Sequence, residues 1–387
     1  MVRPKFSGRF EWAQHPNRLS RLVARKRASG APVLDLTVSN PIRVGLHYPD
    51  WILPALADPA GLVYDPNSAG LLRAREAVSR YYASRGARVE PEQVVLTAST
   101  SEAYSFLFKL LADPGDRVLA PKPSYPLFDF LGRLDGIELG HYQLRYEGGW
   151  WLDVASLKAA ITPRTKAILA VSPNNPTGSC LRTEEWDQIV AICERNKLAF
   201  IVDEVFADFR FIGNDTVSSD NTLVFRLNGL SKILALPQMK LAWIVVEGDP
   251  EQRAAAIEAL EIIADTYLSV ATPVQLAAGK WLERRESVQR ALLERLRENL
   301  AILEKVMQGS AVELLPPEGG WSAVIRLPRT RTEEEWVLDL LASDNTLVQP
   351  GYFFDFEAEA YIVVSLLTPP EEMSKGIGRV VAAASGG

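Results

Sequence analysis

Between residues 93 and 246 the chain alternates short apolar runs with segments of helical periodicity, and this alternation restricts the fold more than any other feature. The runs are apolar throughout, as are strands that helices cover on both faces of a sheet. The pattern predicts an α/β fold with a mostly parallel, seven-stranded-type sheet sandwiched between helices. The predicted strands are VVLTA from Val94, VLAP from Val118, AILAVS from Ala167, AFIVDE from Ala199, TLVFRL from Thr222 and LAWIVV from Leu241.

A second, smaller unit is predicted at the C-terminal end. An Ala-, Leu-, Glu- and Arg-rich tract runs from Pro250 to about Met307 and predicts helix, with a break near residues 269–273. Short strands and helices then alternate in an α+β pattern. We therefore expect a large domain over residues 45–275 and a small domain formed by residues 1–44 and 276–387. The predicted elements of the small domain are the strands VELL from Val312, WSAVIRL from Trp321, TLVQP from Thr346 and YIVVSLL from Tyr361, and the helices Thr332–Ala342 and Glu371–Ala384.

Composition argues against several classes of function. The net charge is -6 over 387 residues, with Lys and Arg spread along the chain, so a nucleic-acid partner is not expected. The two cysteines and three histidines form no ligand cluster in sequence, so no metal site is expected. No apolar run has signal-peptide or membrane-spanning length, and we expect a cytoplasmic protein without a membrane partner.

Polar residues at the carboxyl ends of the predicted strands are the candidates for a functional site, because the carboxyl ends of parallel strands meet at one edge. Ser99, Thr100 and Ser101 follow the first strand where a helix begins. Free backbone N–H groups and the positive end of the helix dipole favour a phosphate there, although an ordinary N-cap would use the same residue types.

Four further residues complete the candidate site. Asp203 follows a buried strand, Asn175 lies in a proline-rich turn, Tyr125 precedes Pro126, and Lys232 lies in an otherwise apolar stretch. A desolvated lysine has a lowered pKa and can form an imine with a carbonyl. Asp203 could keep a pyridine nitrogen protonated, Asn175 could donate to a ring phenolate, and Tyr125 could stack on the ring. Together with the phosphate seat, these residues predict a site for pyridoxal 5'-phosphate.

The same residues lie in motifs that resemble the class I and II aminotransferases, which are fold-type I pyridoxal-phosphate enzymes. The N-P-T-G turn of that family corresponds to residues 175–178, its D-E-x-Y element to residues 203–206, and its S-K pair to Ser231-Lys232. The phrases Pro114-Gly115-Asp116 and Pro123-x-Tyr125-Pro126 also match in order and spacing. The resemblance extends over nearly the whole chain.

The resemblance implies further roles. Tyr64 would reach the phosphate in the partner subunit, which implies a homodimer with shared active sites. Ser231 and Lys240 would join the phosphate seat, with Lys240 in place of the usual arginine, so that the charge is kept and the bidentate fork is lost. Phe206 replaces the tyrosine of the D-E-x-Y element.

The substrate side departs from the family. Where the family has an arginine that binds the substrate α-carboxylate, this chain has Val363, two residues before Ser365. The substrate-binding candidates are therefore Val363 and the loop that contains Asn40. Either another cation such as Arg43 or Lys122 binds the carboxylate, or the substrate is an amine, amino alcohol or amino sugar without one, or the domain has lost turnover.

The predicted function is transfer of an amino group between an amino donor and a carbonyl acceptor. Lys232 is predicted to form the Schiff base and carry the proton, and Asp203 is the second predicted catalytic residue, which keeps the pyridine nitrogen protonated. A lyase or decarboxylase on the same fold remains an alternative, because the cofactor supplies the chemistry in each case. A pyridoxal-phosphate-sensing domain is a non-catalytic alternative. The sequence identifies neither the donor nor the acceptor.

Overall fold

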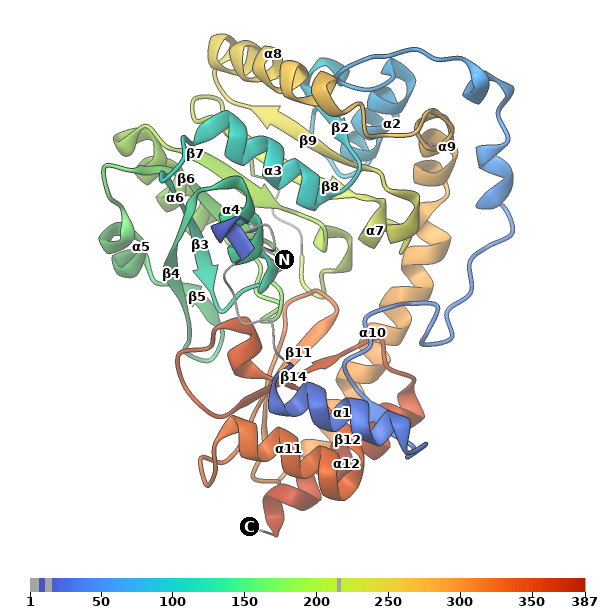
Figure 1. The fold of residues 1–387 in the computed structure, drawn as a ribbon, viewed down its shortest axis with the longest axis vertical. Helices are drawn as coiled ribbons and strands as arrows, with labels where there is room; N and C mark the ends of the chain where they lie inside the picture. Colours follow the sequence, from blue (N-terminus) through green and yellow to red (C-terminus); the bar gives the residue numbers. More distant parts are fainter. Residues whose placement is uncertain (1–6, 11–15, 214–216, 387) are drawn as a thin grey trace, which may run out of the picture.

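The computed structural model describes residues 7–10, 16–213 and 217–386. This part of the chain contains an eight-stranded sheet and a four-stranded sheet, which lie in the upper and lower parts of Figure 1. No helix of the described residues is long and apolar enough to cross a membrane.

The eight-stranded sheet has the order β2-β9-β8-β7-β6-β3-β4-β5. The five strands from β8 to β4 run parallel, whereas β9 is antiparallel to both of its neighbours and β5 is antiparallel to β4. The mostly parallel α/β fold is thus confirmed. The strand bounds are β2 Val94–Thr97, β3 Arg117–Lys122, β4 Glu138–Tyr146, β5 Trp150–Leu152, β6 Thr165–Val171, β7 Ala199–Asp203, β8 Val224–Gly229 and β9 Ala242–Glu247.

The sheet is wider than predicted because β4 and β5 form one edge of it. The sequence of β4, ELGHYQLRY, contains no continuous apolar run. The strand pairs with the edge strand β5 only over Leu144–Tyr146, and most of its side chains are at least partly exposed to water. The predicted strands were recognised by their continuous apolar runs. In the structure β6 and β7 are accordingly buried over nearly their whole length.

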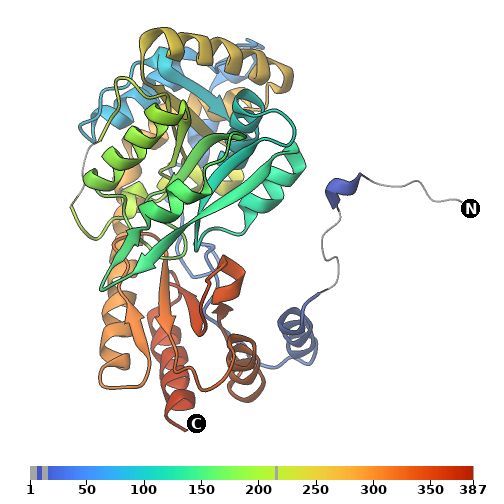
Figure 2. The same cartoon turned by 90° about the vertical axis from the view of Figure 1, so that its left-hand side faces the viewer.

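Helices cover both faces of this sheet, as Figures 1 and 2 show. One apolar cluster joins the sheet to α3 and α8, a second joins it to α5 and α6, and a third joins its β2-β9 end to α2 and α9. Alternate residues of β6 enter the first and second clusters, which is the geometry of a strand buried on both faces. The helix bounds are α2 Leu72–Ala83, α3 Thr100–Leu111, α4 Leu127–Asp135, α5 Val154–Ala160, α6 Thr183–Asn196, α7 Leu230–Ile233, α8 Pro250–Tyr267 and α9 Thr272–Glu283.

The four-stranded sheet is antiparallel, with the order β10-β11-β14-β13. A short parallel pair, β1 (Leu34–Asp35) with β12, joins the N-terminal part of the chain to this unit. The elements are β10 Glu313–Leu315, β11 Ser322–Arg326, β12 Thr346–Leu347, β13 Gln349–Pro350, β14 Tyr361–Ser365, α1 Arg18–Ala28, α10 Arg285–Met307, α11 Glu333–Asp344 and α12 Pro370–Ser385.

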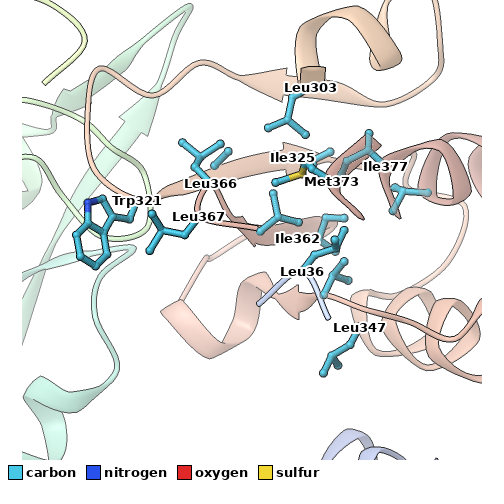
Figure 3. Packing of buried hydrophobic residues seen from close by; sticks show 14 of the residues in the cluster. Leu36, Leu303, Trp321, Ile325, Leu347, Ile362, Leu366, Leu367, Met373 and Ile377 are labelled. Carbon is cyan, nitrogen blue, oxygen red and sulfur yellow. The ribbon is translucent and has the colours of Figure 1, made fainter. Parts of the chain in front are cut away.

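One apolar core holds this smaller unit together. Figure 3 shows side chains from the loop after β1 and from α10, β11, β12, β14 and α12 meeting in it, with Trp321 at the end nearest the larger sheet. Leu36 is fully buried there, and its carbonyl accepts a hydrogen bond from the backbone N–H of Ser365 at 2.7 Å. The loop after β1 is therefore fixed beside the end of β14.

The helical tract predicted from Pro250 to Met307 forms the three helices α8, α9 and α10. The first break falls at residues 268–271, close to the predicted position, and Leu268 adopts a left-handed backbone conformation there. Before α2, residues 41–71 contain the short 3-10 helices η2 (Leu53–Leu56) and η3 (Pro59–Leu62) and run along the outside of the molecule in Figure 1. Leu62, Val63 and Tyr64 are exposed in this segment.

Candidate functional site

A cavity of about 430 Å³ lies between the carboxyl ends of the parallel strands and the four-stranded sheet. Nine of the predicted site residues line it. They are Ser99, Thr100, Ser101, Tyr125, Asn175, Asp203, Ser231, Lys232 and Lys240. The candidate site is therefore assembled from six separate stretches of the sequence, as the meeting of strand ends at one edge of a parallel sheet requires.

An anion seat forms one end of the cavity. Ser99 is the N-cap of α3, and its hydroxyl accepts a hydrogen bond from the Glu102 N–H at 3.1 Å. The pairing of Thr97 with Ala242 places the segment before β9, which contains Lys240, beside this helix start. Hydroxyl groups, the first-turn N–H groups of a 12-residue helix and an ammonium group are a donor set that suits a phosphate.

Lys232 lies in the one-turn helix α7 directly after β8. Its ammonium nitrogen is 4.9 Å from the ring centre of Trp321 and 5.4 Å from that of Phe206. Burial lowers the pKa of Lys232, and the negative charge of Asp203 opposes this shift in part. The side chain is thus held by aromatic rings and has a larger neutral fraction than an exposed lysine.

Asp203 ends β7 and is buried, with 6% of its surface exposed. One carboxylate oxygen accepts a hydrogen bond from the Tyr104 hydroxyl at 2.6 Å, and the other accepts one from the Val205 N–H at 3.0 Å. Burial raises the pKa of Asp203 to about 6, although both hydrogen bonds and the charge of Lys232 act in the opposite direction. Asp203 is therefore a carboxylate that is held in place and that titrates close to neutrality.

The amide of Asn175 is oriented from the smaller sheet. The Ser322 hydroxyl donates to the Asn175 side-chain oxygen at 3.5 Å, which leaves the NH₂ group as the donor that can serve a ligand. Tyr125 has 43% of its surface exposed, and its ring meets that of Phe128 edge to face at 6.0 Å. A planar ligand would find an aromatic face at Tyr125 and an amide donor at Asn175 in the same cavity.

Three predicted site residues lie elsewhere. Tyr64 is 77% exposed and lines a different hollow, next to the end of α8. Asn40 is exposed, and its side-chain oxygen accepts a hydrogen bond from the Ile42 N–H, while its neighbour Ser39 lines the cavity instead.

Val363 does not line the cavity, so its prediction as a substrate contact is corrected. It is 1% exposed and packs with Trp150, Val324 and Phe354. Ser365 is two residues further along β14 and lies on the same face as Val363, because successive residues of a strand alternate between its faces. Unlike Val363, Ser365 lines the cavity. Phe354, which lines the cavity itself, is packed against Val363.

Neither of the alternative cations proposed from the sequence reaches the cavity. Arg43 is exposed and is not part of the wall. Lys122 forms an ion pair with Asp355 at 3.5 Å and is also outside the wall. Among the described residues that line the cavity, the cationic side chains are those of Lys232 and Lys240.

The sequence reasoning missed the part of the site that the smaller sheet and the N-terminal loop contribute. Tyr104 was also missed, although its position four residues after Thr100 places it on the same face of α3. The remaining residues lie at strand ends of a unit that the sequence does not place next to the larger sheet. They are Thr37, Ser39, Trp321, Ser322, Gln349 and Ser365.

Residues 49–380 match the family model described as aminotransferase class I and II. The match covers both sheets and every one of the nine predicted residues that line the cavity. Among the described residues, no group of three or more His, Cys, Asp and Glu side chains is arranged to hold a metal ion.

Individual relatives give the same family. The chain is 31% identical over 374 residues to an alanine aminotransferase of Mycobacterium tuberculosis, covering 92% of this chain and 87% of the relative. It is 28% identical over 346 residues to a glutamate-pyruvate aminotransferase of Escherichia coli, covering 86% and 85%. Among solved structures, an alanine aminotransferase from Pyrococcus furiosus superposes with a TM-score of 0.89 at 25% identity, over 99% of this chain and 100% of the other.

Proposed function

Because the chain belongs to the class I and II aminotransferase family and is a pyridoxal-phosphate-dependent aminotransferase, we propose that Lys232 holds the cofactor covalently and carries the proton in the reaction. The observation that carries this proposal is the position of Lys232. Its partly buried amine lies in the cavity next to two aromatic rings, has a lowered pKa, and shares the cavity with Asp203. Both covalent attachment and proton abstraction require a neutral amine.

The residues present fit pyridoxal 5'-phosphate. Ser99, Thr100, Ser101, Ser231 and Lys240 supply hydroxyl and ammonium donors for its phosphate. The first-turn N–H groups of α3 and the positive end of the helix dipole add to this seat. One end of the cavity therefore has the donors that a phosphate monoester needs.

The rest of the cofactor finds partners in the same cavity. Asp203 would pair with the pyridine nitrogen, Asn175 would donate to the ring oxygen, and Tyr125 would cover one face of the ring. The bound cofactor supplies an electron sink for charge that develops on the substrate carbon next to nitrogen. The carboxylate of Asp203 maintains that sink, and the hydroxyl of Tyr104 holds the carboxylate in place.

Lys232 would move the proton from the substrate carbon. The amine of Lys232 lies in the cavity next to the rings of Trp321 and Phe206, where it would be within reach of a bound substrate. Burial lowers its pKa, so a larger fraction of the amine is neutral and able to accept the proton and return it. No other described residue of the cavity wall combines a titratable nitrogen with this degree of burial.

We also propose that the protein acts as a homodimer in which Tyr64 completes the site of the partner subunit. Leu62, Val63 and Tyr64 expose a contiguous apolar segment on the outside of the molecule, where a second copy could cover it. The domain division into residues 45–275 against residues 1–44 and 276–387 is proposed with it, because the cavity lies where these two parts meet.

The amino donor and acceptor belong to the proposal as well. The relatives are named for alanine, glutamate and pyruvate, which makes these compounds the first to assay. A lyase or decarboxylase on the same scaffold would release ammonia or carbon dioxide without converting the cofactor to its amine form. A sensing domain would bind the cofactor and convert no amine.

Reduction with borohydride followed by peptide mass mapping tests the central assignment. The reduced cofactor should label the peptide that contains Lys232, and Lys232→Ala should abolish both the label and the visible absorbance of the holoprotein. Lys280→Ala, on the surface of α9, is the matched control and should retain both. A label on any other lysine in the wild type would show that the attachment site is wrong.

A further inference from the structure

The part of the cavity wall that faces the cofactor seat consists of uncharged polar groups. Its members come from the loop after β1 and from the ends of the strands β11, β13 and β14 of the four-stranded sheet. Ser322 is the cross-strand partner of Ser365, and the Ser365 N–H bonds to the carbonyl that precedes Thr37, so these residues form one continuous surface. We call this surface the neutral wall. It consists of Thr37, Ser39, Ser322, Gln349 and Ser365.

Two members of the neutral wall, Ser39 and Gln349, have side chains that can still form hydrogen bonds with a ligand. The Thr37 hydroxyl donates to Asp35 at 2.6 Å, and the Ser322 hydroxyl donates to Asn175. Ser39 and Gln349 have no hydrogen-bond partner for their side chains among the described residues. A hydroxyl and a carboxamide can both donate and accept, which suits a substrate group that does the same.

The charged residues of the cavity are already engaged by the cofactor in the proposed function. Asp203 and Lys232 act at the ring, and Lys240 lies beside the start of α3, at the phosphate seat. Next to Ser365, on the same face of β14, Val363 packs in an apolar cluster that includes Phe354. Among the described residues, the neutral wall therefore adjoins an apolar cluster and no cation.

An anionic substrate group placed against this wall would lose its water without gaining a counter-charge, which is costly in a partly enclosed cavity. A hydroxyl group would exchange its hydrogen bonds with water for hydrogen bonds with Gln349 and Ser39 at little net cost. Sites built from hydrogen-bonding groups also discriminate strongly by the presence of a matching hydroxyl.

We propose, on the basis of the aminotransferase function above, that the amine substrate is an amino alcohol. The carbon that bears its nitrogen carries a hydroxymethyl-type group in the position where an amino acid carries its carboxylate. In the half reaction the substrate carbon loses its proton to Lys232 and its nitrogen to the cofactor. A water molecule supplies the oxygen of the product carbonyl as the nitrogen leaves, and the substrate is oxidised by two electrons. The cofactor retains these electrons in its amine form and receives the proton back. The product is a hydroxylated ketone or aldehyde.

Two matched pairs of probes test this substrate class on the holoprotein. L-Alaninol and L-alanine differ only in a hydroxymethyl group against a carboxylate, and a single-turnover absorbance change reports conversion of each. 2-Amino-2-methyl-1-propanol and 2-aminoisobutyrate differ in the same way but have no proton on the reacting carbon, so calorimetry measures binding alone. The alcohol of each pair should be favoured by at least about tenfold.

The outcomes separate the two proposals. Preference for L-alanine and 2-aminoisobutyrate would overturn the amino-alcohol assignment and leave the aminotransferase intact. Equal behaviour of the two members of each pair would also overturn it. Conversion of no amine by a holoprotein that is labelled at Lys232 would overturn the proposed function itself, and the amino-alcohol assignment with it.

A variant test locates the specificity on the wall. Gln349→Ala should weaken binding of 2-amino-2-methyl-1-propanol by about two- to tenfold while the cofactor absorbance and cofactor affinity stay unchanged. Gln308→Ala, an exposed position beyond α10, is the matched control and should bind as the wild type does. Unchanged binding in Gln349→Ala together with Ser39→Ala would show that the hydroxyl group is not held by this wall.

Discussion

Replacing Asp203 by Asn should stabilise the protein without cofactor while weakening its hold on the cofactor. The side chain is 6% exposed, and burial raises its pKa from 3.8 to about 6. An asparagine can keep both hydrogen bonds, because its oxygen can accept from the Val205 N–H and its NH₂ group can donate to the Tyr104 hydroxyl. The substitution therefore removes the cost of a buried charge together with its weaker attraction to Lys232, and both are included in the net pKa shift of Asp203.

The magnitude follows from linkage between protonation and folding. The folded-state pKa lies above the unfolded value, so Asp203 favours the folded state below pH 3.8 and this contribution is lost as the pH rises through about 6. The difference is about 2.2 pH units, at about 1.4 kcal/mol each, or about 3 kcal/mol in total at pH 8. At pH 5 the same relation gives about half of that.

Urea unfolding of the apoprotein, followed by tryptophan fluorescence at one fixed protein concentration, measures this difference. Asp203→Asn should exceed the wild type by about 3 kcal/mol at pH 8 and by about half as much at pH 5. Asp339→Asn on the surface of α11 is the control and should show no such trend. A stability difference that is absent at pH 8, or that shrinks as the pH rises, would refute the reasoning.

Three further outcomes are expected. Tyr104→Phe removes one hydrogen bond from Asp203, so the pH below which cofactor affinity falls should move upward, as a fluorescence titration of the apoprotein with cofactor between pH 5 and 8 would show; an unmoved profile would contradict the role of Tyr104. Lys240→Ala should weaken cofactor binding by about 10- to 100-fold and Lys240→Arg by no more than about threefold, and equal losses in the two variants would exclude a charge effect. Tyr64→Ala should weaken cofactor binding in the dimer while leaving the sedimentation coefficient of the dimer unchanged, and wild-type affinity in this variant would place Tyr64 outside the site.

The sequence predicted the cofactor side of the cavity because most of its residues follow an apolar strand, whereas Ser231 and Lys240 came from the family resemblance. Lys232 follows β8 and Asp203 ends β7, so recognising the strands was enough to bring these side chains to one edge. The break between α8 and α9 was equally legible, since the helical pattern stops near residue 269. Local patterns of this kind are preserved in the folded chain because they direct the packing.

The substrate side was not predicted, since it depends on contacts between distant parts of the chain. Whether Val363 or Ser365 reaches the cavity depends on what covers each, and the aromatic residue that packs against Val363 comes from another loop. Trp321 and Gln349 carry no motif of their own and reach the site only because the smaller sheet packs against the larger one. Strand β4 was missed for a related reason, because a partly exposed strand near the end of a sheet does not have the continuous apolar pattern of a central strand.

The cavity draws its floor from the eight-stranded sheet and its neutral wall from the four-stranded sheet and the loop after β1. The residues of the neutral wall are polar and belong to none of the hydrophobic clusters, so exchanging them leaves those clusters in place. A lineage can retain the lysine, aspartate and phosphate seat while it exchanges wall residues one at a time, and each intermediate still folds and still binds the cofactor. Substrate preference in such a scaffold can diverge gradually, while the residues that bind the cofactor and move the proton stay unchanged.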